Sequence, residues 1–286
     1  MPLVKSRVMV LSVVLGVLLG LFIVVSLPSN TAYSIASEGP NGLSDLYAKL
    51  DVRVLYSLSE LSNLNSESIL LICARAEPPG GVKQLLDFVE GGGVVVAYGS
   101  PEYLVEVLEE LGTHASFRGY VRDAVFNAGD LDSVLVNTTY GNAVFRKPYA
   151  LDVDFSSSSV SVIAWSSLFS YVDVSGNNLY DLNEPIGSFP LGVEVTLEKG
   201  KILVLFSKIL VLFTEYLLEN SVLTHNLDFI KVLAGNKTVV VDQSEMRSHL
   251  VEILRAQLVQ RSSPSIYVVL PLLALLSVVA YLAVKK

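Results

Sequence analysis

Two long apolar runs without a charged residue, one near each end, constrain this chain more than any other feature. Residues 8–27 read VMVLSVVLGVLLGLFIVVSL, and residues 262–284 read SSPSIYVVLPLLALLSVVAYLAV. About 20 apolar residues in a helix span a bilayer core of roughly 30 Å. The runs therefore predict transmembrane helices over residues 8–28 and 265–284. A cleaved signal peptide is the alternative for the first run, although that run is longer than the roughly 7–15 apolar residues of a signal sequence.

Basic residues beside the two runs predict their orientation. Lys5 and Arg7 precede the first run, and Lys285 and Lys286 follow the second. Positively charged flanks stay in the cytoplasm. The sequence thus predicts a two-pass cell-membrane protein with a cytoplasmic tail over residues 1–7, both termini cytoplasmic and the central domain outside the cytoplasm. Other membrane or envelope proteins are the partners that this location favours.

The central region is strongly acidic. The chain has 28 acidic and 20 basic residues, and four of the basic residues lie in the terminal flanks, which leaves 16 against 28 and a net charge of −12. Such a charge opposes binding to nucleic acid. Because Cys73 is the single cysteine, no internal disulfide can form.

Apolar strands and amphipathic helices alternate over residues 33–242, the predicted extracytoplasmic domain. Residues 69–73 and 94–97 form continuous apolar runs, which are typical of strands buried on both faces. Alternation of this kind predicts an α/β domain with an open, largely parallel sheet of the doubly wound, flavodoxin-like type. Short β-rich runs over about 116–197 predict an inserted or appended antiparallel section, a β-rich insertion in the α/β domain. The remaining predictions are a helix over residues 210–218 and a juxtamembrane helix over residues 243–263.

Three features that suggest catalysis have simpler structural explanations. Gly91-Gly92-Gly93 closes a helix and opens a strand, the reverse of a phosphate-binding loop. Cys73 lies inside an apolar strand, where a thiol is inert. Ser100 stands before Pro101 at a helix start and lacks the Gly-x-Ser-x-Gly elbow of a nucleophile, so a capping role explains it.

One loop has the spacing of a metal site. Asp173, Ser175, Asn177, Leu179, Asp181 and Glu184 occupy loop positions 1, 3, 5, 7, 9 and 12 of an EF-hand, with Leu179 supplying its carbonyl. Calcium prefers several oxygen ligands on a flexible loop. These residues therefore predict a calcium site, and calcium is the one cofactor that the sequence suggests. The alternative is an Asp- and Asn-rich turn exposed to water.

The order of several segments resembles a known family. These segments are Ser37-Glu-Gly-Pro-Asn-Gly-Leu-Ser-Asp-Leu-Tyr47, Gly91-Gly-Gly-Val-Val-Val96, the loop over residues 173–184, Gly200-Lys-Ile-Leu-Val-Leu-Phe206 and Asn226-Leu-Asp-Phe-Ile230. They resemble the uncharacterised prokaryotic domain-of-unknown-function family 4350 over most of residues 33–242. The resemblance implies a glutamine-amidotransferase-like domain between membrane anchors, with an assembly partner. The amidotransferase cysteine is missing, and Ser207-Lys208 stands where the family has an Asp.

These observations favour a non-enzymatic, membrane-anchored interaction domain, acting as an accessory or scaffold subunit of a cell-envelope or transport complex. Two alternatives stay open. One is a degenerate amidotransferase-like hydrolase that uses Ser100 or an aspartate. The other is a module that binds a glycan or an envelope polymer, which aromatic residues gathered on one exposed loop face would favour.

Overall fold

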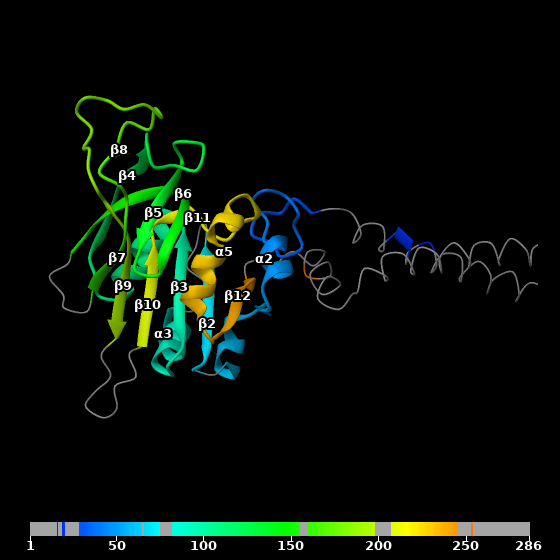
Figure 1. Ribbon diagram of the computed structural model, residues 1–286. Coiled ribbons are helices and arrows are strands. Elements are labelled where there is room, and N and C mark those ends of the chain that lie inside the picture. The colour runs from blue at the N-terminus through cyan, green and yellow to red at the C-terminus, as the bar shows by residue number, and fades with distance from the viewer. Residues whose placement is uncertain are drawn as a thin grey trace, which may run out of the picture.

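The computed structural model describes residues 29–64, 66–74, 82–154, 160–197 and 207–244, together with Gly16, Leu19, Gly20 and Ile253. Within these residues the chain forms one mixed sheet of 12 strands with few helices (Figure 1). The strand order is β1-β12-β2-β3-β10-β9-β7-β5-β6-β4-β8, and β11 pairs with β6 beside this path. The strands are β1 (Val52–Leu55), β2 (Ser68–Ala74), β3 (Val94–Gly99), β4 (Ala115–Asp123), β5 (Ser133–Thr138), β6 (Gly141–Val153), β7 (Val160–Trp165), β8 (Ser170–Asp173), β9 (Pro190–Leu197), β10 (Ser207–Leu212), β11 (Thr214–Tyr216) and β12 (Thr238–Asp242). The helices are α2 (Ser44–Lys49), η1 (Leu58–Asn63), α3 (Val82–Glu90), α4 (Pro101–Glu110) and α5 (Asn220–Ala234).

One half of the sheet is parallel. It consists of β1, β12, β2, β3 and β10, and every residue of β3 is buried, as expected for a strand covered on both faces. Phe229 of α5 shares an apolar core with Leu71 of β2 on one face. Phe88 of α3 shares a second core with Leu70 on the other face. Successive residues of one strand thus point their side chains into two separate cores.

The other half of the sheet is antiparallel and continues directly from β10. β9 pairs with β10 from Leu197–Ser207 to Gly192–Leu212, and β7, β5, β6, β4 and β8 follow. Asn226 of α5 ties this half to the helix layer. Its side-chain amide accepts from the amide of Val144 at 2.7 Å and donates to the carbonyls of Val144 and Leu217 at 2.8 Å each. The loops from β4 to β5 and from β8 to β9 lie at the upper end of the molecule (Figure 1).

The predicted fold class was wrong in its main feature. The sheet is mixed rather than largely parallel, so it is not of the amidotransferase or flavodoxin type. The expected β-rich insertion does not form a separate unit, because β9 extends the same sheet beside β10. The predicted helix over residues 210–218 is replaced by β10 and β11. Its apolar run is buried on both sides, and periodicity alone cannot separate a short buried strand from a helix.

The structure also corrects the membrane prediction. In the part of the chain that it describes, no helix is both long and apolar enough to cross a bilayer. The predicted spans over 8–28 and 265–284 lie outside the described residues except at Gly16, Leu19 and Gly20, as does most of the predicted helix over 243–263. The described residues therefore support neither flanking transmembrane helices nor the predicted two-pass localisation.

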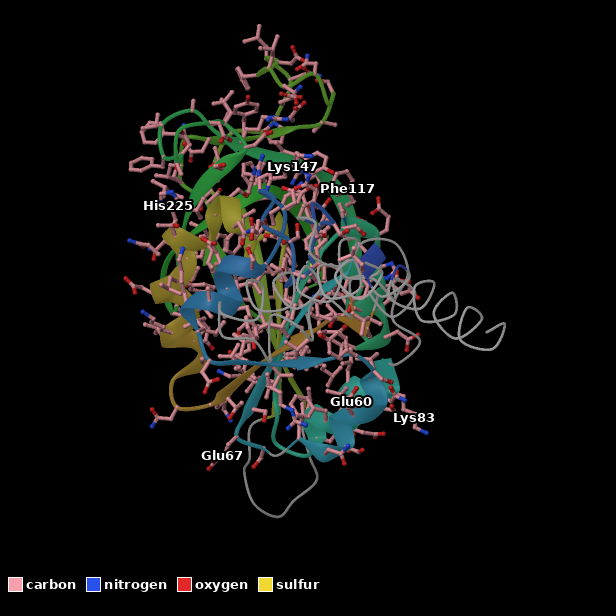
Figure 2. All side chains as sticks on the ribbon, turned by 90° about the vertical axis from the view of Figure 1, so that its right-hand side faces the viewer. Glu60, Glu67, Lys83, Phe117, Lys147 and His225 are labelled. Atoms are coloured by element: carbon pink, nitrogen blue, oxygen red, sulfur yellow. The ribbon has the colours of Figure 1, made fainter. Side chains whose placement is uncertain are left out.

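Residues 29–43 pack across the carboxyl end of β12 and the start of α5. The side-chain amide of Gln243, just after β12, donates to the carbonyl of Tyr33 at 2.6 Å and accepts from the amide of Ile35 at 3.1 Å. Asn220, the first residue of α5, donates to the carbonyl of Ser37 at 3.1 Å. Glu67 before β2 lies at the lower end and Lys147 of β6 toward the upper end, so the parallel strands run upward (Figure 2). Open α/β sheets bind ligands at this carboxyl edge, and here part of it is filled by the chain itself.

A buried acid lies beneath this segment. Tyr98 at the end of β3 donates to Glu219 Oε1 at 3.3 Å, while Glu219 Oε2 has no hydrogen-bond partner among the described residues. Burial raises the pKa of Glu219 to about 8, although hydrogen bonds from backbone amides and from Tyr98 oppose the shift. The carboxyl group is therefore protonated at neutral pH.

Glu219→Gln should make the stability of the fold less dependent on pH. The folded pKa of about 8 exceeds the ordinary value of 4.5. The stabilising contribution is therefore complete below the unfolded pKa and declines, by about 1.4 kcal/mol per pH unit, as the pH rises toward the folded pKa. Urea unfolding at pH 5 and pH 8 should show a loss of several kcal/mol in the wild type and a clearly smaller loss in the variant. Equal losses in both proteins would contradict the assignment.

Candidate functional site

Most large apolar side chains exposed by the described residues lie on three loops of the antiparallel half. Such patches mark interaction sites, because soluble proteins rarely expose large contiguous apolar surfaces. The side chains are Val125, Phe126 and Leu131 between β4 and β5, Leu168 and Phe169 between β7 and β8, and Val174, Leu179, Tyr180, Leu182 and Ile186 between β8 and β9.

The β4–β5 and β7–β8 loops, together with Ser188 shortly before β9, border a groove with a volume of about 610 Å³, here called the aromatic groove. None of the described residues that line it is charged. Trp165 at the end of β7 pairs with Asn137 of β5, which pairs with Asn142 of β6, so the three residues form a row across three strands. The lining residues are Phe126, Leu135, Val136, Asn137, Asn142, Trp165, Ser166, Ser167, Leu168 and Ser188.

The fully buried carboxylate of Asp123, the last residue of β4, holds both loops. Its Oδ1 accepts from the backbone amides of Val125 at 2.9 Å and Phe126 at 2.7 Å. Its Oδ2 accepts from the hydroxyl groups of Ser167 and Ser170. Burial raises the pKa of Asp123, but these hydrogen bonds outweigh burial and lower it from its ordinary value. The ionised carboxylate therefore fixes the apolar loops at both sides of the groove.

Arg122, the neighbouring residue, holds the third loop. Its guanidinium is buried, and Nε donates to Asp173 Oδ2 at 2.9 Å. The two terminal nitrogens donate to Asp132 and Asn178. Burial raises the pKa of Asp173, but the bond from Arg122 and the backbone amides of Asn178 and Gly176 lower it overall. A buried arginine thus connects the β4–β5 loop with residues 174–186, here called the finger loop.

The structure gives the residues of the predicted calcium site other partners. Asp173 accepts from Arg122 and from the amides of Gly176 and Asn178. Glu184 accepts from the amides of Val174, Ser175 and Asp181, which lower its pKa. Asn177 donates to Asp181 at 3.0 Å.

Leu179, at the position expected to offer its carbonyl, exposes its side chain. Among the described residues, no three His, Cys, Asp or Glu side chains group as a metal site. Calcium binding stays a prediction, and the loop has an internal hydrogen-bond network that explains the same residues.

The residues considered for catalysis have structural roles. Ser100 Oγ caps α4 by accepting from the amide of Tyr103 at 3.3 Å, and Pro101 is the first helical residue, as predicted. Gly91 to Gly93 separate α3 from β3, also as predicted, and a Cβ on Gly93 would lie 2.3 Å from the ring of Phe88. Cys73 is half-buried in β2 beside Tyr98.

No protein family model matches the chain, and no curated protein matches it. The resemblance to the family of unknown function therefore stays a prediction. The amidotransferase-like and cell-envelope assignments that followed from it have no support in either comparison.

The sequence contains one signal for the groove that helix and strand periodicity does not reveal, namely apolar residue pairs within turns. Val125-Phe126 and Leu168-Phe169 are apolar pairs inside polar turns. Turns usually carry polar residues, so an apolar pair there is unusual. What the sequence could not indicate is that both pairs lie beside one carboxylate, since Asp123 and Ser167 come together only in the folded sheet.

Asp123→Ala should destabilise the fold by about 3 kcal/mol at pH 7, because four hydrogen bonds to one buried carboxylate are lost. The contribution of Asp123 is present above its unfolded pKa and is lost as the pH falls through its lower folded pKa, so the difference from wild type should shrink in acid. Urea unfolding from pH 7 down to pH 3 measures it. Asp228→Ala, at a side chain that is 97% exposed, is the matched control and should change stability little. A comparable loss in both variants would contradict the role of Asp123.

Proposed function

We propose that this chain is a non-enzymatic interaction domain that acts as an accessory or scaffold subunit and holds a partner protein in the aromatic groove. One observation carries the proposal: exposed aromatic and aliphatic side chains gather around a groove that no charged residue lines. Centres of protein interfaces are enriched in Trp, Phe and Tyr and depleted of charge. The groove has this composition.

The hydrogen bonds of Asp123 support the same proposal. Binding costs free energy when loops must become ordered. Val125 and Phe126 on one loop, and Ser167 and Ser170 at the other, already bond to one carboxylate. A partner would therefore meet a preformed surface. The net charge of the chain, −8, opposes nucleic acid as that partner.

A glycan is the second candidate ligand. Exposed side-chain amides of Asn137 and Asn142 stand in one row with Trp165, and an aromatic ring beside amide groups can stack on a sugar ring while the amides bond to its hydroxyl groups. A hydrolase receives less support, because Ser100 Oγ serves as the cap of α4.

Affinity capture from a native extract tests the proposal. The bait is the full chain, compared with the double variant Phe126→Ala/Trp165→Ala. Both side chains are partly exposed, 45% and 44%, so the variant should stay folded. The control is Val232→Ala on α5, whose side chain is 61% exposed and lies outside the groove. We expect a reproducible partner with the wild type and the control, and at least tenfold less with the double variant.

The outcomes separate the candidates. A captured protein that depends on the groove supports the proposed function, and a captured polysaccharide supports the glycan alternative. A partner that the double variant retains would contradict the groove as the binding site. Because Trp165 is the single tryptophan, its fluorescence reports binding at the groove directly.

A further inference from the structure

The finger loop buries one of its two carboxylates and exposes large apolar side chains. Glu184 within the loop and Asp173 just before it are buried at 6% and 2% exposure, whereas Asp181 is partly exposed and accepts a hydrogen bond from Asn177. Leu182 is 96% exposed and Leu179 66%, and Tyr180 is exposed beside them. A loop in water normally has the opposite arrangement, because exposing large apolar side chains costs free energy. The finger loop therefore has the character of one side of an interface.

This loop is also conformationally defined. Asp173 and Glu184 accept hydrogen bonds from backbone amides along the loop, and Arg122 donates to Asp173. Asn178 has φ of 64°, a left-handed conformation that asparagine tolerates, and its side chain accepts from Arg122. Ordering the loop on binding should therefore cost little.

The finger loop and the aromatic groove are complementary surfaces of the same chain. The groove is open and has a volume of about 610 Å³, and none of the described residues that line it is charged. The largest exposed side chains of the finger loop are apolar or aromatic, and smaller polar side chains, among them Asn177 and Asn183, are exposed between them. Within the described part of the chain, Leu168 of the groove is 74% exposed and Leu182 of the finger loop is 96% exposed.

Charge restricts where two copies of this chain can meet. Each copy carries a net charge of −8, so most of their surfaces repel one another. A contact between an uncharged groove and a loop whose carboxylates are already hydrogen-bonded avoids bringing like charges together. We propose that the finger loop of one copy fills the aromatic groove of a second copy, which produces head-to-tail self-association. The inference rests on the proposed function, because it names the partner of the same groove.

This pairing of a loop with a groove predicts how copies of the chain would assemble. A patch that fits a groove elsewhere on the same molecule forms a heterologous contact, which closes into a ring or continues as a chain. Each copy has one finger loop and one groove. A copy with a defective finger loop can still receive one, and a copy with a defective groove can still donate one.

Sedimentation velocity of the full chain, in mild non-ionic detergent to keep the apolar terminal runs apart, tests the inference. Leu182→Asp disables the finger loop and Leu168→Asp disables the groove, both at exposed positions where folding should not suffer. We expect the wild type to increase in mass with concentration and each variant alone to associate at least tenfold more weakly. An equimolar mixture of the two variants should form a heterodimer, because one intact contact remains. Val232→Asp, exposed on α5, should associate like the wild type.

Fluorescence of Trp165 and added salt give two further measurements. Emission should shift to shorter wavelength when the wild type associates and should stay constant for Leu182→Asp. Added salt should strengthen association, because it screens the repulsion between acidic copies.

The inference is overturned if the wild type stays monomeric, if either variant associates like the wild type, or if the mixture forms no heterodimer. Capture of a different protein by the groove of a monomeric chain would overturn self-association and leave the proposed function intact. Failure of both experiments would remove the proposed function as well.

Discussion

Two consecutive residues at the end of β4 hold the three loops on which the proposed binding surfaces depend. The carboxylate of Asp123 accepts hydrogen bonds from the β4–β5 loop and from Ser167 and Ser170 around β7 and β8. The guanidinium of Arg122 bonds to Asp132 and to Asp173 and Asn178 of the finger loop. Successive strand residues point to opposite sides, so one strand end serves two separate networks. Buried ions are costly unless all their hydrogen bonds are made. Removing the partners of either Asp123 or Arg122 should therefore destabilise more than a single contact.

The position of the groove follows from the mixed topology of the sheet. In an open parallel sheet the binding site is expected at the carboxyl ends of the strands. Here residues 29–43 pack across the end of β12 and the start of α5, where Gln243 and Asn220 bond to their backbone. The antiparallel half instead presents loops whose apolar side chains are exposed. The surface available to a partner is therefore on the half of the sheet that the sequence pattern described least well.

Most of the parallel strands could be predicted because their signal is local, whereas β10 was predicted in part as a helix. The apolar runs of β2 and β3, the Ser100 cap and the glycines after α3 each depend on a few neighbouring residues. The joining of β9 to β10 could not be predicted, since pairing between distant strands leaves no local pattern. It decides whether the β-rich section is an insertion or an extension of the sheet. Apart from Gly16, Leu19 and Gly20, the terminal apolar runs lie outside the described residues.

The candidate site, too, could be predicted only where the sequence signal is local. The spacing of Asp173, Asn177, Asp181 and Glu184 predicts a metal ion, which stays a prediction, and in the structure these residues form a hydrogen-bond network. The competing partner, Arg122, is distant in the sequence and could not be inferred from the loop. Likewise, the apolar pairs at Val125-Phe126 and Leu168-Phe169 could be read from the sequence, whereas their common support by Asp123 required the fold.

Hydrogen exchange of individual backbone amides tests most directly whether the surfaces are preformed by Arg122 and Asp123. In the wild type, we expect slow exchange at Val125 and Phe126, bonded to Asp123, and at Gly176 and Asn178, bonded to Asp173. Asp123→Ala should speed exchange at the first pair, and Arg122→Ala at the second, each with a smaller effect on the other pair. Rapid exchange at all four amides in the wild type, or equal acceleration of both pairs by either substitution, would contradict the account.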